Sequence, residues 1–218
     1  NHALNARTVL CNLLIDSGED DAALKTSEEA IRMIEALPAD LEKSTDLPVS
    51  IARTYDLAAK LETRFGRAES ADQHFANAIT WLENLPAAMK EELSAKALLS
   101  IVHADRGELR KNSDRLQDAL EDTDRSITLN EQIVASHPDH YQYTVNLGGA
   151  YANRGGVLVD LGKFDDAAKS LERGRELLRK VLETHPRDQF ITLQLAIATL
   201  GLGDLGTRRR EMEEAAEH

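Results

Sequence analysis

A period of 48 residues constrains this chain more than any other feature of its sequence. Turn positions recur at that interval, and the fifth residue after each turn position is an alanine. The turn positions are Gly18, Gly66, Asp114, Gly162 and Arg210, and the alanines are Ala23, Ala71, Ala119, Ala167 and Ala215. Self-similarity at a fixed period of tens of residues indicates a repeat array, in which each unit packs only on its neighbours.

Two further columns indicate how the units are built. Seven residues before each turn position the side chain is small, and five residues before it the side chain is apolar. The small column holds Cys11, Ala59, Gly107, Gly155 and Gly203, and the apolar column holds Leu13, Leu61, Leu109, Val157 and Leu205. Small residues let helix backbones approach closely, and apolar side chains fill the remaining gap. We therefore expect an all-α fold, an α-solenoid of antiparallel helix hairpins.

Stop signals divide this expected single array into units. Four of the prolines end helices, at Pro38, Pro86, Pro138 and Pro186. The units are expected at about 1–38, 39–86, 87–138, 139–186 and 187–218, the last one truncated. Residues 38–46 read as a polar linker. The turn expected at Arg210 would make the chain stop early in a second helix, like a piece of a longer protein.

Three details of the helices follow from the same pattern. The first helix is expected to bury Leu10, Leu13 and Leu14. The first helix of the third unit is expected to run from Ala87 to about Asn112, and Ser113 or Asp114 to cap the helix that returns. Four glycines inside one predicted helix predict either a close helix approach or a kink. They are Gly148, Gly149, Gly155 and Gly156.

Charge and cysteine content argue against several functions. The net charge is −12, with 26 Lys and Arg against 38 Asp and Glu, so a nucleic-acid partner is not expected. No apolar run approaches the ~20 residues of a membrane span, so membrane insertion is not expected either. Cys11 is the single cysteine and excludes an intrachain disulfide. We interpret Cys11 as a buried packing residue, with a reactive thiol as the alternative, and expect a cytoplasmic location.

Several motifs invite a catalytic or metal-binding interpretation, and the repeat register argues against each. The sequence GLGDLG at 201–206 matches a dinucleotide fingerprint, but the register places it inside a helix. The segment 103–112 has the wrong spacing for a kinase catalytic loop. His137 and His140 could be metal ligands, but His137 recurs as His185 at a helix end. Acidic pairs recur at helix starts. We expect no catalytic residue, no metal and no cofactor, and so no enzyme in this segment.

The repeats resemble the tetratricopeptide repeat (TPR) family. The shared pattern is an aromatic residue, a small residue four positions later, a turn glycine, and then A-x-x-x-F. It is carried by Tyr55, Ala59, Gly66, Ala71 and Phe75. The period of 48 departs from the 34 residues typical of the family. The resemblance implies a right-handed α-solenoid, the TPR-like superhelix, and a non-catalytic scaffold that binds a peptide or helix of a protein partner in a concave groove.

The resemblance also implies which residues face that groove. They are Asn5, Thr8, Asn12, Asp16, Arg53, Asp56, Lys60, Arg64, Asp105, Glu108, Lys111, Asn112, Asn153 and Asp160. The carboxylate clamp that binds chaperone tails needs Lys and Arg where this chain has Thr8, Ile101 and Asp105. We therefore expect no binding of chaperone tails. The incomplete last unit leaves self-association possible.

The fourth unit, with its LGKFDDA turn and its VLETHP ending, also resembles repeats that follow planctomycete-type bacterial Ser/Thr protein kinases. This resemblance implies an alternative function, a regulatory or docking segment of a larger bacterial signalling enzyme.

Overall fold

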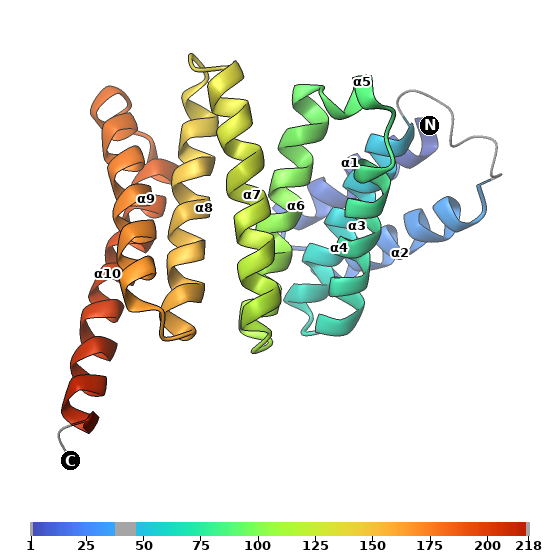
Figure 1. The fold of residues 1–218 in the computed structure, drawn as a ribbon. Coiled ribbons are helices and arrows are strands. Elements are labelled where there is room, and N and C mark those ends of the chain that lie inside the picture. The colour runs from blue at the N-terminus through green and yellow to red at the C-terminus, as the bar shows by residue number, and fades with distance from the viewer. Residues whose placement is uncertain (1, 38–46, 217–218) are drawn as a thin grey trace. The chain divides into compact units, whose positions relative to one another are not determined.

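The computed structural model describes residues 2–37 and 47–216, and the expected linker at 38–46 lies outside them. Every regular element in these described ranges is a helix (Figure 1). The all-α prediction is therefore confirmed. The chain divides into two compact units, unit 1 (Asn1–Leu109) and unit 2 (Arg110–His218). The division into five repeat units stays a prediction.

The helices of unit 1 are α1 (His2–Asp16), α2 (Asp20–Glu35), α3 (Leu47–Arg64), α4 (Ala68–Glu83), α5 (Ala87–Lys90) and most of α6 (Leu93–Asn112). Unit 2 holds the end of α6, α7 (Leu116–Ser136), α8 (Tyr141–Asp160), α9 (Phe164–Thr184) and α10 (Gln189–Ala216). Within the units, α1 with α2, α3 with α4, and α8 with α9 form helix pairs joined by short turns.

Four turns share one backbone geometry. The residues Gly18, Gly66, Asp114 and Gly162 have φ of +75°, +73°, +61° and +71°, the left-handed region that glycine adopts without strain. Each turn closes with the two hydrogen bonds of a Schellman motif. At Gly162, for example, its N–H donates to Val159 O and the Lys163 N–H donates to Leu158 O. The expected cap at Ser113 or Asp114 is wrong, because Asp114 takes the left-handed position and Arg115 occupies the N-cap.

The alanine column lies inside the hairpins. Ala23, Ala71, Ala119 and Ala167 are all fully buried. In unit 2 the helices α8 and α9 approach closely at glycines. A side chain at Gly155 would collide with Leu171, and one at Gly148 would collide with Leu178. Of the two interpretations of the glycine-rich stretch, close approach therefore explains Gly148 and Gly155.

The predicted buried stripe of α1 is wrong. Leu10 and Leu13 are 48% and 58% exposed, and Leu14 is half-buried. The helix instead buries Leu4, Thr8 and Cys11. The reason is that the apolar column packs back on the preceding hairpin, as Leu61 packs on Cys11 and Ala23. No hairpin precedes α1 in the described part of the chain.

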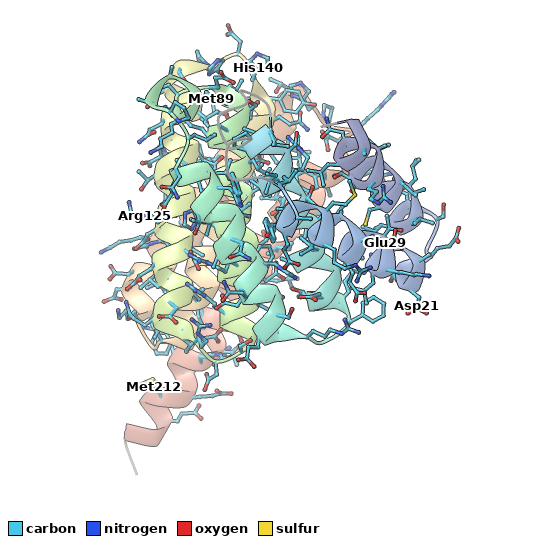
Figure 2. All side chains as sticks on the ribbon, turned by 90° about the vertical axis from the view of Figure 1, so that its right-hand side faces the viewer. Asp21, Glu29, Met89, Arg125, His140 and Met212 are labelled. Atoms are coloured by element: carbon cyan, nitrogen blue, oxygen red, sulfur yellow. The ribbon has the colours of Figure 1, made fainter. Side chains whose placement is uncertain are left out.

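Two helix boundaries also differ from prediction. The helix expected from Ala87 is broken, because the short α5 ends at Lys90 and α6 begins at Leu93. The break lets Met89 on α5 (Figure 2) and Leu98 on α6 both reach the core of unit 1. The turn expected at Arg210 does not exist, because α10 runs unbroken through it. Arginine lacks the freedom of Gly18 to adopt positive φ.

Candidate functional site

A cavity of about 430 Å³ opens in unit 1 among α1, α3 and α6. This volume lies in the range of pockets that bind ligands. Its polar lining consists of Thr8, Asn12, Arg53, Asp56, Lys60 and Arg64, and its apolar lining of Ile15, Leu57, Leu61, Leu98 and Ile101. Helix period explains this arrangement, because residues three and four apart on α3 share one face.

The charged groups of the cavity form a paired network with one exception. Lys60 Nζ lies 2.9 Å from Asp56 Oδ2 and 2.8 Å from Asp105 Oδ2, which joins α3 to α6. Arg64 contacts Asp20 at 2.8 Å. Arg53 is exposed and makes no ion pair with any residue of the described ranges. The cavity therefore offers one guanidinium that is free to bind an anionic group.

Burial changes the acid–base properties of the Asp56–Lys60 pair. Burial raises the pKa of the Asp56 carboxyl, although Lys60 and Arg53 oppose the change. Burial lowers the pKa of Lys60, but the carboxylates of Asp56 and Asp105 outweigh it and the net pKa is raised. Asp56 Oδ1 is buried and accepts no hydrogen bond from the residues that the structure describes. A buried carboxylate oxygen without a donor is costly, so a ligand that donates to it gains affinity.

The structure brings together part of the predicted groove. Six of the predicted residues, Thr8, Asn12, Arg53, Asp56, Lys60 and Arg64, line the cavity. Asp105 joins them through Lys60. Asn5, Asp16 and Glu108 are exposed in unit 1 but do not line the cavity. The four remaining residues, Lys111, Asn112, Asn153 and Asp160, belong to unit 2.

Sequence reasoning missed the apolar wall of the cavity. Leu57 and Leu61 each follow a predicted groove residue directly, and Ile101 lies four positions before Asp105. The sequence signal for this wall was therefore an apolar residue next to, or one helical turn from, a predicted polar groove residue. With this wall, the site can hold an apolar group as well as a charged one.

Comparison with solved structures identifies the architecture. The chain aligns with yeast histone chaperone Hif1 over 95% of both chains, with a TM-score of 0.70 and 14% identity. It aligns with BtubC (BKLC) from P. vanneervenii over 97% of this chain and 77% of that one, with a TM-score of 0.64 and 17% identity. No family model and no curated protein sequence matches the chain.

A third structure names the repeat type. It is the Podospora anserina putative kinesin light chain with nearly identical TPR-like repeats, which aligns over 99% of this chain and 93% of that one, with a TM-score of 0.62 and 16% identity. The chain has the TPR-like fold. The expected resemblance to TPR proteins is thereby confirmed at the level of the fold.

The remaining predicted groove residues belong to unit 2, where two of them form an ion pair. Asp160 lies 3.6 Å from Lys111 and 3.3 Å from Arg208. Asn153 is half-buried, and Asn112 is exposed. Arg208 was not predicted, because the sequence placed a turn two residues after it. Asp160 and its two cations link α6, α8 and α10, and all three side chains are partly exposed.

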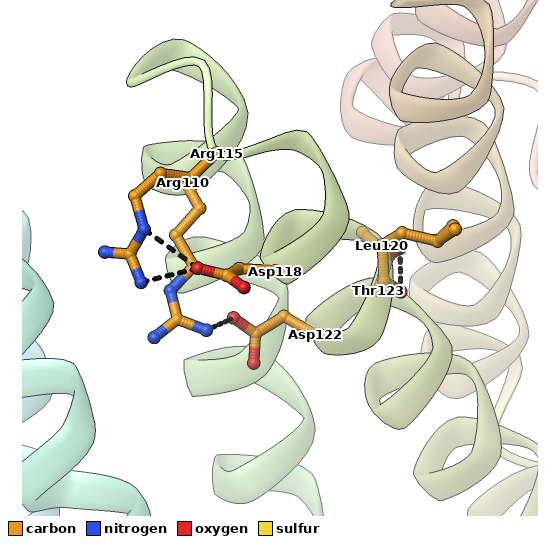
Figure 3. Close-up of polar contacts among 6 residues, drawn as sticks. All are labelled: Arg110, Arg115, Asp118, Leu120, Asp122 and Thr123. Carbon is orange, nitrogen blue, oxygen red and sulfur yellow. Dashed lines mark hydrogen bonds and ion pairs between the residues drawn. The ribbon is translucent and has the colours of Figure 1, made fainter. Parts of the chain in front are cut away.

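A buried ion pair lies at the start of unit 2 (Figure 3). Arg110 Nη1 contacts Asp122 Oδ2 at 2.9 Å, and the two side chains are 15% and 2% exposed. One helical turn away, Arg115 contacts Asp118 at 2.7 Å, but both side chains are nearly half exposed. Away from water, opposite charges attract each other more strongly, and a charge that loses its partner costs more free energy. The Arg110–Asp122 pair therefore matters more for stability than the Arg115–Asp118 pair.

A second cavity of about 200 Å³ in unit 1 brings together Ser27, Glu62 and His74. These residue types occur in hydrolase triads, and sequence reasoning did not link them. Glu62 Oε2 lies 3.6 Å from His74 Nε2, without a hydrogen bond. The Ser27 hydroxyl donates to Leu24 O of its own helix at 2.7 Å, so it is not presented to the imidazole. The arrangement therefore lacks an activated nucleophile.

Proposed function

We propose that the chain is a protein-interaction scaffold, and that the cavity among α1, α3 and α6 binds a peptide segment of a protein partner. The observation that carries the proposal is the composition of this cavity. It joins an apolar wall to Arg53, which makes no ion pair within the described residues, and to Asp56 Oδ1, which accepts no hydrogen bond from them. Such a mixture suits a peptide, which presents apolar side chains, carboxylates and N–H donors together.

The TPR-like fold supports the scaffold interpretation. Hif1, which shares this fold, is a scaffold protein that recruits protein complexes to core histones. For the present chain, the inference is restricted to the class of function, protein binding without catalysis. The kinase-attached alternative and the cytoplasmic location stay predictions from the sequence.

The cavity favours a definable class of peptide. An aliphatic or aromatic side chain would fill the space bounded by Leu57, Leu98 and Ile101. An acidic side chain beside it would bind the Arg53 guanidinium, which pairs well with carboxylates. An N–H group of the peptide would donate to Asp56. A short motif with adjacent apolar and acidic residues is therefore the expected ligand.

A peptide selection tests this proposal. The full 218-residue chain would be used to select peptides from a random display library, and their affinities would be measured by calorimetry. We expect enrichment of adjacent apolar and acidic residues. Ile101→Glu is expected to weaken binding at least about ten-fold, because Ile101 is 39% exposed and lines the cavity.

The matched control is Leu193→Glu, an exposed apolar residue of unit 2. It should leave peptide affinity unchanged. Selection of peptides without this motif, or equal affinity of Ile101→Glu and the parent chain, would show that the cavity is not the binding site.

A further inference from the structure

Helix α10 presents an apolar face to solvent. Its inner face buries Ile191, Ala198 and Leu205 against unit 2. On the opposite face, Leu193 and Leu200 are 56% and 73% exposed. At 100° per residue, the outward row is Leu193, Ala196, Leu200, Gly203 and Thr207, with Phe190 and Ile197 along one edge. The spacing of three and four residues in this row is that of a coiled-coil seam.

Gly203 in this row makes no close contact in the part of the chain that the structure describes. A side chain there would meet nothing within 4 Å, whereas one at Gly155 would collide with Leu171. Glycine in a helix interior lowers stability relative to alanine. Gly155, in the same repeat column, makes room for Leu171, and Gly203 leaves the same kind of room for a large side chain of a partner.

Charge is also absent from the first half of α10. No charged residue occurs between Gln189 and Gly203, in a chain in which 29% of residues are charged. By length and composition alone, Gln189–Met212 is long and apolar enough to cross a membrane. The expectation that no apolar segment approaches the length of a membrane span is therefore wrong, whereas the expectation of no membrane insertion stays a prediction.

An interface with another protein molecule fits the surroundings of α10 better than insertion into a bilayer does. Arg209 Nη2 contacts Asp165 on α9 at 2.7 Å, and Arg208 contacts Asp160 on α8 at 3.3 Å. Together with the buried Ile191, Ala198 and Leu205, these contacts hold the helix on α8 and α9. Insertion into a bilayer would break them, whereas docking of a partner on the outward face would not.

We propose that the partner is a second copy of this chain, bound through antiparallel pairing of α10 with α10. In a coiled-coil seam the apolar residues alternate between two positions of a seven-residue repeat, named 'a' and 'd'. In an antiparallel pair, each residue at position 'a' packs against a residue at position 'd' of the partner helix. This register places Leu193 opposite Gly203 and Leu200 opposite Ala196, in each copy. Every layer then combines one large and one small side chain. Parallel pairing would instead place Gly203 opposite Gly203 and Ala196 opposite Ala196, and leave voids.

The flanks of the seam agree with the same register. The twofold axis of this register is level with Ala198, so Ile197, one residue away, comes close to its own copy, and Phe190 extends the apolar edge beside it. Thr192 and Thr199 lie along the other edge, so no like charges meet between Phe190 and Gly203. An isologous contact of this kind closes as a dimer. Because one helix per copy makes a small interface, the dimer should depend on concentration.

Sedimentation velocity over a concentration series of the full chain tests the proposal. The parent chain should shift from monomer to dimer, and Leu193→Glu and Leu200→Glu should each raise the dissociation constant at least about ten-fold. Ile101→Glu in the cavity of unit 1 should leave dimerisation unchanged, so failure of this proposal and failure of peptide binding are distinguishable. Circular dichroism confirms that each variant is folded.

Cysteine crosslinking tests the orientation. Because Leu193 is about 15 Å along the axis from its own copy in the antiparallel register, Leu193→Cys alone should not crosslink. A mixture of Leu193→Cys and Gly203→Cys should crosslink, as should Ile197→Cys alone. Self-crosslinking of Leu193→Cys would contradict the orientation. A parent chain that stays monomeric over the whole concentration series would overturn the proposal. So would co-flotation of the parent chain with lipid vesicles that is lost in Leu193→Glu.

Discussion

Cys11 shows how the repeat pattern controls chemistry at a single residue. Its side chain is 1% exposed, and its Sγ lies 3.2 Å from Ala23 O, across the α1–α2 hairpin. Burial raises the pKa of this thiol to about 11. Since the thiolate is the reactive form, the alternative of a reactive cysteine is not supported by the structure.

Labelling with a thiol reagent checks this interpretation. At pH about 8, Cys11 should react roughly a hundred-fold more slowly in the folded chain than in urea, because burial suppresses the thiolate and blocks access. Equal rates in the two states would contradict the buried position.

Asp56 predicts a pH dependence of peptide binding. An N–H donor favours the ionised carboxylate, and burial raises the pKa of Asp56. Affinity should therefore be constant near neutral pH and fall as the pH is lowered through this raised pKa. Without ligand the sign is reversed. Because the pKa of Asp56 is raised in the folded state, its protonated form stabilises the fold at pH values below its unfolded-state pKa. This stabilisation is lost as the pH rises through its folded-state pKa.

Fluorescence anisotropy of a selected peptide between about pH 4 and 8 measures this dependence. Asp56→Asn should remove the fall in affinity over the window, because amide side chains do not titrate. An unchanged pH profile in Asp56→Asn would show that the fall in affinity does not arise from Asp56.

At the scale of helices, the alanine column sets how closely the hairpins pack. Ala71 and Ala167 are fully buried, so Ala71→Leu and Ala167→Leu should each destabilise the fold by about 1–3 kcal/mol through overpacking. Urea unfolding measures the change. The control is Ala22→Leu, on an exposed position of α2, which should change stability by less than about 0.5 kcal/mol.

The two ion pairs of Figure 3 provide a second test at this scale. Asp122→Ala should cost about 3–5 kcal/mol, because it removes the buried carboxylate that contacts the largely buried Arg110 guanidinium. Asp118→Ala removes an exposed pair and should cost less than about 1 kcal/mol. Similar losses for both variants in thermal unfolding would show that burial does not distinguish the pairs.

Across the whole molecule, the sequence predicted most where neighbouring hairpins pack on each other. The turn positions Gly18, Gly66, Asp114 and Gly162 and the buried alanines follow directly from the 48-residue period, because the same contact recurs in each hairpin. The prediction failed for Leu13, which has no preceding hairpin in the described part to pack on, and at Arg210, where the register continued but no residue suited to positive φ was present.

The candidate site was predictable only in part. Repeat columns indicate which residues share a helix face, and so they found Asp56 and Lys60 on α3. They cannot show which faces enclose a cavity, because that depends on the positions of three helices in space. The apolar wall at Leu98 and Ile101, and the unsatisfied Asp56 Oδ1, therefore required the structure.

The central claim is that the cavity among α1, α3 and α6 binds a peptide. Methyl NMR of the full chain, titrated with a selected peptide, tests it most directly. We predict that the methyl signals of Ile15, Leu57, Leu61, Leu98 and Ile101 shift together with one affinity, while those of Leu193 and Leu200 on α10 do not respond to the peptide. Shifts confined to residues outside the cavity would contradict the account.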